Sequence, residues 1–178
     1  EIRNFALSEL TSFELQPQLS SEMGYLTLFT LGIAEYVAKD WQASIDLFDA
    51  ALEGLQTSDS LDLSSAFFYK GNAHLLTKSF GEALAAYDAA LEIKPDDYGA
   101  LHNKGNALSG LGKYEEAIAI YDAVLQIKPD YHGIINNKGN ALSGLGKYEE
   151  AIAIYDTELE IKPEFNEAIN NKGNEIDD

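Results

Sequence analysis

KGNALSGLGKYEEAIAIYD occurs twice in this chain, at Lys104–Asp122 and again at Lys138–Asp156. The two copies start 34 residues apart, and a looser copy, KGNAHLLTKSFGEALAAYD, starts the same distance earlier, at Lys70. A weaker copy surrounds Gly32, which precedes Gly71 by 39 residues, so five additional residues separate these two copies. A fixed period of this length indicates a repeat architecture in which each copy is one small structural unit.

Each period contains two amphipathic helix patterns. In the third copy the first helix is predicted from about Tyr98 to Leu111, and the second covers KYEEAIAIYDAVLQIK. Apolar residues of that second helix recur at the spacing of one helix face, at Tyr114, Ala117, Ile118, Tyr121, Val124 and Leu125. A single helical hairpin cannot bury such a face, so neighbouring hairpins must stack on one another. The sequence therefore predicts an all-α protein of stacked hairpins.

Turn signals separate the predicted helices. Gly112 and Gly146 stand where a left-handed residue ends the first helix of a hairpin. Ser79 and Glu82 have the spacing of a capping box that opens the second helix. Prolines follow the second helix and prevent its continuation, at Pro95, Pro129 and Pro163.

The pattern resembles the tetratricopeptide repeat family, whose period is 34 residues and whose signature runs W-x2-L-G-x2-Y, A-x3-F and P. The third copy fills these slots with Leu101, Lys104, Gly105, Leu108, Ala117, Tyr121 and Pro129. The fourth fills them with Ile135, Lys138, Gly139, Leu142, Ala151, Tyr155 and Pro163, and the second with Phe67, Lys70, Gly71, His74, Ala83, Tyr87 and Pro95. The first copy departs from the signature at Ser44, Phe48 and Gln56. The resemblance implies a right-handed α-solenoid of helix-turn-helix repeats.

We divide the chain at these signals. Full repeats are expected at about 25–63, 64–97, 98–131 and 132–165, and a partial repeat at 166–178. Residues 1–24 are expected to contain an amino-terminal helix, which fits either the end of an earlier repeat or a capping helix.

Composition excludes several classes of partner. The chain has 30 acidic residues against 12 lysines and arginines, a formal charge of −18, and therefore repels nucleic acid and anionic membrane surfaces. No apolar run approaches the roughly 20 residues of a membrane span. We expect no membrane insertion and a cytoplasmic location, with Glu1 fitting either a processed chain or a domain excised from a longer protein.

The sequence contains no constellation typical of catalysis or cofactor binding. It has no cysteine, and its three histidines, His74, His102 and His132, lack the spacing of metal ligands. The acids recur in every repeat on the polar face of the second helix, which is typical of a solvated surface. We therefore expect no enzyme activity, no metal site and no cofactor.

A row of lysines departs from the family signature. Lys70, Lys104, Lys138 and Lys172 occupy a slot that the family usually fills with leucine. Their stems are expected to pack between helices while the ammonium groups reach water or an acid of the neighbouring repeat. A row of ligand-contacting lysines is the alternative.

The resemblance implies that the first helix of each repeat lines a concave surface that binds a peptide. On this chain that surface is rich in asparagine, whose amides match the hydrogen-bonding groups of a peptide backbone and resemble the peptide-clamping ladder of O-linked N-acetylglucosamine transferases. The predicted polar contacts are Asn72, His102, Asn103, Asn106, Asn136, Asn137, Asn140, Asn170 and Asn171. Apolar anchors are predicted in the amino-terminal half of the surface, chiefly Tyr36, Phe68 and Tyr69.

Both the predicted asparagine contacts and the predicted apolar anchors have an alternative interpretation. The asparagines fit simple copying of one ancestral repeat, and the apolar residues fit a core covered by the segment before Tyr25. At the level of function, a module that binds an extended segment of a partner protein is the main hypothesis. Self-assembly through the unfinished carboxyl-terminal repeat, giving a homo-oligomer, and a regulatory domain of a larger protein are the others.

Overall fold

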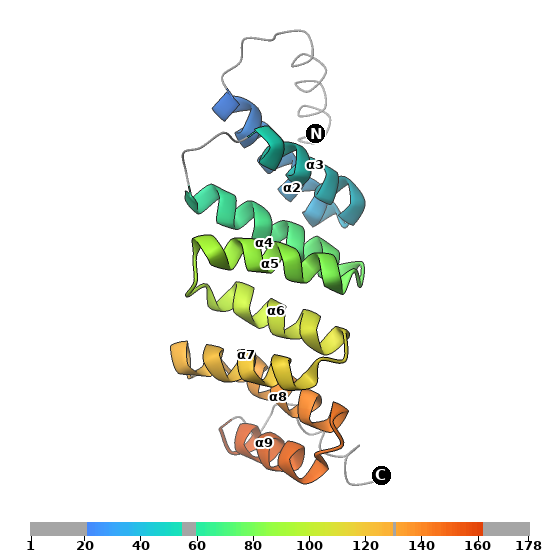
Figure 1. The fold of residues 1–178 in the computed structure, drawn as a ribbon, viewed down its shortest axis with the longest axis vertical. Coiled ribbons are helices and arrows are strands. Elements are labelled where there is room, and N and C mark those ends of the chain that lie inside the picture. Colours follow the sequence, from blue (N-terminus) through green and yellow to red (C-terminus); the bar gives the residue numbers. More distant parts are fainter. Residues whose placement is uncertain (1–20, 55–59, 130, 162–178) are drawn as a thin grey trace. The chain divides into compact units, whose positions relative to one another are not determined.

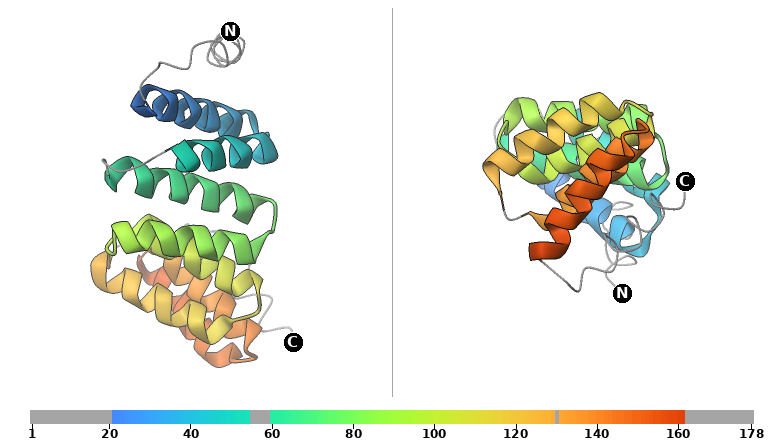
Figure 2. Two further views of the ribbon diagram at one scale, coloured as in Figure 1. Left: turned by 45° about the horizontal axis from the view of Figure 1, so that its top comes forward. Right: turned by 90° about the horizontal axis from the view of Figure 1, so that it is seen from below.

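The structure, a computed structural model, describes residues 21–54, 60–129 and 131–161. Its helices fall into two compact units, one ending at Pro95 and the other beginning at Asp96. The first unit contains α2 (Ser21–Ala38), α3 (Trp41–Gly54), α4 (Ser60–Leu76) and α5 (Phe80–Ile93). The second contains α6 (Tyr98–Gly110), α7 (Tyr114–Ile127), α8 (His132–Gly144) and α9 (Tyr148–Ile161). Each unit therefore holds two helical hairpins and, in its described residues, no strand, as the sequence predicts (Figures 1 and 2).

The helix boundaries follow the predicted ones closely in the second unit. The helix expected from about Tyr98 to Leu111 is α6, which ends at Gly110 with Leu111 as its C-cap. In the first unit the first helix of each hairpin is longer, because α2 begins inside the segment 1–24 and α4 begins before residue 64. The sequence has no proline shortly before α4, whereas Pro95 precedes α6 and Pro129 precedes α8. The rest of segment 1–24 and the partial repeat 166–178 lie outside the described residues.

The glycine turns of the second unit are confirmed. Gly112 and Gly146 both have φ of 73°, in the left-handed region that glycine enters without strain. The amide of Lys113 donates to the carbonyl of Leu108 over 2.9 Å and that of Gly112 to Ser109 over 3.0 Å, which is the Schellman pattern. Lysines adopt the same conformation in the first unit, at Lys39 (φ 65°) and Lys78 (φ 60°).

The capping prediction at Ser79 is wrong. Ser79 precedes α5 but its side chain makes no cap hydrogen bond, because its ψ of 67° departs from the extended backbone of a capping serine. The cap that the sequence analysis missed is Asp97, with ψ of 94°, whose carboxylate accepts from the amides of Gly99 and Ala100 over 3.0 and 3.2 Å. This carboxylate satisfies two of the free amides at the start of α6.

A ring against a glycine joins the two helices of each hairpin. A Cβ atom added to Gly71 would lie 2.6 Å from Cε1 of Tyr87, so the helices approach too closely for any side chain there. The same contact recurs in every hairpin, as Gly32 with Phe48, Gly105 with Tyr121 and Gly139 with Tyr155. These four rings are almost completely buried, and burial of such a ring stabilises the fold by about 2 kcal/mol. The repeated glycine and aromatic slots thus form the core of each hairpin.

Candidate functional site

Three of the predicted asparagines are bonded to tyrosines of the same hairpin. The hydroxyl of Tyr87 donates to Oδ1 of Asn72 over 2.8 Å. Tyr121 donates to Asn106 over 2.9 Å, and Tyr155 to Asn140 over 2.7 Å. Part of the asparagine row therefore has a structural role, because each amide oxygen satisfies the hydroxyl of a ring in the core.

The sequence itself carries the signal for this pairing. In the first hairpin the tyrosine slot holds Phe48 and the asparagine slot holds Ile33. Where the hydroxyl is absent, its acceptor is absent too. A comparison of these two slots across the repeats therefore predicts the tyrosine partners, which the helix patterns alone do not.

A second set of hydrogen bonds joins α6 to α8. Nδ2 of Asn137 donates to Oδ1 of Asn106 over 2.9 Å and to Nε2 of His102 over 2.8 Å. The other ring nitrogen, Nδ1, lies 3.0 Å from Oη of Tyr131. Because Nε2 faces amide hydrogens and must accept, Nδ1 carries the ring hydrogen and donates it to Tyr131. Burial lowers the pKa of His102, which favours this neutral ring.

Two of these residues, Asn106 and Asn137, line a small hollow of the second unit. It has a volume of about 180 Å³ and is lined by Asn106, Ser109, Tyr114, Tyr121, Asn137, Asn140 and Ala141. Burial raises the pKa of Tyr121 to about 12, with a smaller opposing effect from its hydrogen bond to Ser109, so that its hydroxyl stays neutral. The lining therefore carries no net charge near neutral pH although the chain as a whole is strongly acidic.

The hydrogen bonds determine which amide atoms face the hollow. Both bonds of Asn137 use Nδ2, so its Oδ1 accepts no hydrogen bond from any residue that the structure describes. Asn106 uses its oxygen twice, while its Nδ2 makes one contact of 3.3 Å, to Nε2 of His102, and retains a second hydrogen. Among the side chains that line the hollow, Asn137 thus offers an acceptor and Asn106 offers a donor.

The remaining predicted polar residues are placed differently. Asn136 is only 1% exposed, so it does not lie on the surface where we expected it. Adjacent residues of a helix point about 100° apart, so when Asn137 faces the hollow its neighbour turns into the hairpin. Asn103 is half-buried on α6 and does not line the hollow. Asn170 and Asn171 lie outside the described residues.

The predicted apolar anchors form an aromatic cluster in the first unit. The ring of Tyr69 lies 5.7 Å from that of Tyr36 and 5.5 Å from that of Phe68, both in edge-to-face geometry. It also contacts Phe29 and Phe48. Burial, with a smaller effect from Tyr69, raises the pKa of Tyr36. These anchors are half-buried against one another, and residues 1–20 of the segment expected to cover them lie outside the described residues.

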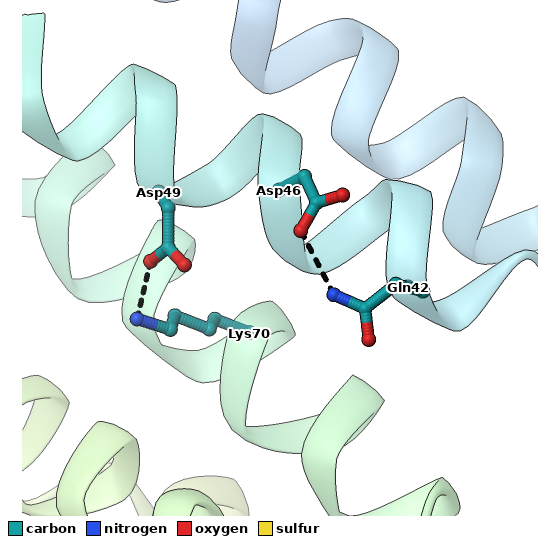
Figure 3. Close-up of polar contacts among 4 residues, drawn as sticks. All are labelled: Gln42, Asp46, Asp49 and Lys70. Atoms are coloured by element: carbon teal, nitrogen blue, oxygen red, sulfur yellow. Dashed lines mark hydrogen bonds and ion pairs between the residues drawn. The ribbon is translucent and has the colours of Figure 1, made fainter.

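The expected role of the lysine row is confirmed at two positions. Lys70 of α4 forms an ion pair with Asp49 of α3, which belongs to the preceding hairpin (Figure 3). Lys138 of α8 pairs with Asp122 of α7 over 2.7 Å in the same way. Both lysines are about one-fifth exposed, so their stems are largely covered while the ammonium groups reach the acid. Lys172 lies outside the described residues.

A larger groove in the second unit is a weaker candidate. It has a volume of about 540 Å³ between α7, α8 and α9, and its charged groups include the Lys138–Asp122 pair and Lys147 with Glu150, 3.4 Å apart. These charges already have partners, whereas the smaller hollow presents oriented amide atoms. We therefore take the smaller hollow as the candidate site. Among the described residues, no cluster of histidine, aspartate and glutamate side chains could hold a metal ion, and no helix is long and apolar enough to cross a membrane.

Comparisons with known proteins agree with this architecture. Two tetratricopeptide-repeat family models match, one at residues 74–135 and 108–170 and the other at 29–98. A comparison with curated proteins finds no match. Among solved structures, the chain is similar to YrrB, with a TM-score of 0.77 and 20% identity over 97% of this chain and 90% of YrrB. It is also similar to MamA of Desulfovibrio magneticus, with a TM-score of 0.72 and 20% identity over 79% of this chain and 77% of that one.

A third similar structure is a tetratricopeptide repeat protein of Parabacteroides merdae, with a TM-score of 0.74 and 20% identity over 84% of this chain and 57% of that one. At such identities the structural likeness shows the fold, and the family models add the signature residues. The matched residues extend over more than half of the chain. The protein belongs to the tetratricopeptide repeat family.

Proposed function

We propose that this chain, a protein-interaction module of the tetratricopeptide-repeat type, binds an extended segment of a partner protein at the amide-lined hollow of its second unit. The observation that carries the proposal is the pair of oriented amide atoms, Oδ1 of Asn137 and an Nδ2 hydrogen of Asn106. A peptide unit has one N–H and one C=O, so it can satisfy both. YrrB, which has a similar fold, is described as a TPR protein with an unusual peptide-binding site.

The size and charge of the hollow limit the ligand. A volume of about 180 Å³ holds only part of a peptide, so the rest of the segment lies on the adjoining surface. The lining is uncharged, and a chain with a formal charge of −18 repels acidic partners. We therefore expect a neutral or basic segment.

The affinity should be modest. Each hydrogen bond contributes about 0.5 to 1.5 kcal/mol net, whereas association costs several kcal/mol of lost freedom. Two amide contacts alone thus predict dissociation constants no tighter than the millimolar range. Tight binding would require additional apolar anchors on the ligand.

A display library of random twelve-residue peptides, selected on the full chain at pH 8, tests the proposal. Selected peptides are labelled and their dissociation constants measured by fluorescence anisotropy. We expect Asn137→Ala to weaken binding about tenfold, and Gln126→Ala, which removes an exposed amide from α7, to leave it unchanged. Circular dichroism checks that both variants remain folded. Failure to select any binder, or equal affinities for the two variants, would reject the hollow as the binding site.

A further inference from the structure

The hydrogen bonds around the hollow form a continuous relay with a direction. It runs from Tyr131 through His102, Asn137 and Asn106 to Tyr121, whose hydroxyl lies 3.3 Å from Oγ of Ser109. Because Tyr121 uses its hydrogen on Asn106, Ser109 donates in this contact, and the Ser109 hydroxyl can rotate to accept instead. The direction of the relay is therefore set at its other end, by the histidine ring.

We propose that His102 is a positioning residue that sets the hydrogen-bond polarity of the hollow, and that its protonation reverses that polarity. The inference rests on the proposed function, because it concerns the regulation and specificity of the same site. With a neutral ring, Nε2 accepts from Asn137 and the amide oxygen of Asn137 faces the ligand. Only a ligand that donates a hydrogen bond, such as a peptide N–H, matches that oxygen.

Protonation makes this arrangement untenable. The incoming proton binds Nε2, which then directs an N–H at Nδ2 of Asn137, 2.8 Å away, and at Nδ2 of Asn106, 3.3 Å away. Donors would then face donors. Rotating the amide of Asn137 by half a turn places its oxygen against the imidazolium and its nitrogen in the hollow.

The rest of the relay can follow this rotation. The oxygen of Asn137 would then face Oδ1 of Asn106 at the present 2.9 Å, so Asn106 must rotate too and donate through Nδ2. That Nδ2 also lies within reach of the Tyr121 hydroxyl, which turns its own hydrogen to Ser109. Every contact is satisfied again, and the group that Asn137 presents to the ligand has changed from acceptor to donor.

The surroundings of His102 place the switch on the acidic side of neutrality. Within the second unit, the ring is hydrogen-bonded to Asn137 of α8, to Asn106 of its own helix and to Tyr131 of the α7–α8 connection, none of which is a carboxylate. Lys128 stands over the rings of Tyr98 and Tyr131, 4.7 and 5.5 Å from their centroids, so the charged group that packs on the Tyr131 ring is a cation rather than an acid. Burial lowers the pKa of the imidazole. At neutral pH the ring of His102 is therefore neutral, and the amide oxygen of Asn137 faces the ligand.

Nitrogen-15 NMR of the full chain tests the relay directly and without any ligand. At pH 8 the ring shifts of His102 should show the Nδ1–H tautomer. On acidification the side-chain amide signals of Asn137 and Asn106 should move with the same midpoint as the ring. An Nε2–H tautomer at pH 8 would overturn the proposal. So would side-chain amide signals of Asn137 and Asn106 that do not shift as His102 titrates.

Peptide binding supplies the second readout. For a peptide selected at pH 8, the dissociation constant of the wild type should rise about tenfold or more at a pH below the His102 midpoint. His102→Asn, which introduces the residue found at the equivalent Asn136, should lose this dependence, while His74→Asn in the other unit should keep it. Equal pH dependence in wild type and His102→Asn contradicts the switch. A chain that binds no peptide at all refutes the proposed function instead, and the NMR titration still decides the relay.

Discussion

Tyr121 donates its hydroxyl hydrogen to Oδ1 of Asn106, 15 residues earlier in the chain, over 2.9 Å. The bond ties the two helices of a hairpin together at the point where the tyrosine ring is buried. Tyr87 with Asn72 repeats this relationship in the first unit. The hydroxyl of a buried ring needs a hydrogen-bond acceptor, and the asparagine on the facing helix supplies it.

The first prediction uses the first hairpin as a template, since Phe48 and Ile33 occupy the same two slots there. Tyr87→Phe should lower the free energy of unfolding by about 1 to 2 kcal/mol, because the buried amide of Asn72 loses a donor. Asn72→Ile should lower the free energy of unfolding by at least as much, because it removes the acceptor of the buried Tyr87 hydroxyl. The double variant should cost less than the sum by about 1 to 2 kcal/mol. Urea unfolding of the four proteins measures this coupling, and strictly additive losses would show that the bond is energetically unimportant.

The second prediction concerns the close approach of the helices at Gly71. Gly71→Ala should destabilise the fold by about 1 to 3 kcal/mol, because the added Cβ would lie 2.6 Å from the ring of the fully buried Tyr87. Gly81→Ala is the matched control. Gly81 lies in α5 with no heavy atom within 4 Å of an added Cβ, so alanine there should stabilise by about 0.5 to 1 kcal/mol. Thermal unfolding followed by circular dichroism separates the two, and similar effects of both substitutions would contradict the packing argument.

Features encoded locally could be predicted from the sequence. The helices follow from apolar spacing, and the left-handed Gly112 follows from its place directly after Leu111, the C-cap of α6. The sequence predicts that Lys70 reaches water or an acid of the neighbouring repeat, because a lysine in an apolar slot must still solvate or pair its charge. It does not name Asp49 as the partner. The stacking of hairpins follows from their inability to bury an apolar face alone.

Features that depend on the register of one helix against another could not be predicted. Asn136 is buried and its neighbour Asn137 is only half-buried, and the packing of α8 decides which of the two faces the hollow. The relay through His102 joins residues 29 to 35 positions apart, which no local pattern encodes. Ser79 is a residue type that often caps helices, but its ψ of 67° differs from that of a capping serine, and the sequence does not encode that angle.

The third prediction exploits the turn that lysine occupies in the first unit. Lys78 has φ of 60°, a conformation that costs a residue with a side chain about 1 to 2 kcal/mol. Lys78→Gly should therefore stabilise the fold by about 0.5 to 1 kcal/mol, after the greater flexibility of glycine in the unfolded chain is subtracted. Gly112→Ala, the reverse change at the equivalent turn, should destabilise by about 1 kcal/mol. Urea midpoints that move in the same direction for both variants would contradict this account.

The last prediction follows from the lowered pKa of His102. Because burial disfavours the charged imidazole in the folded state, the unfolded chain binds a proton more readily than the folded one. Stability therefore rises with pH in the window between the lowered folded value and the usual value of 6.5, and it is lost as the pH falls through that window. His74, whose pKa is also lowered chiefly by burial, contributes in the same direction, so each histidine needs its own variant.

Urea unfolding at pH 7.5 and pH 5.5 gives the comparison for wild type, His102→Asn and His74→Asn. The loss of stability on acidification should be smaller in each variant than in the wild type, because each lacks one group that must be protonated. His102 is the more deeply buried of the two and loses its hydrogen-bond acceptor role on protonation, so its replacement should remove the larger share. A wild-type loss that persists undiminished in His102→Asn would mean that the imidazole titrates in the folded protein as it does in water.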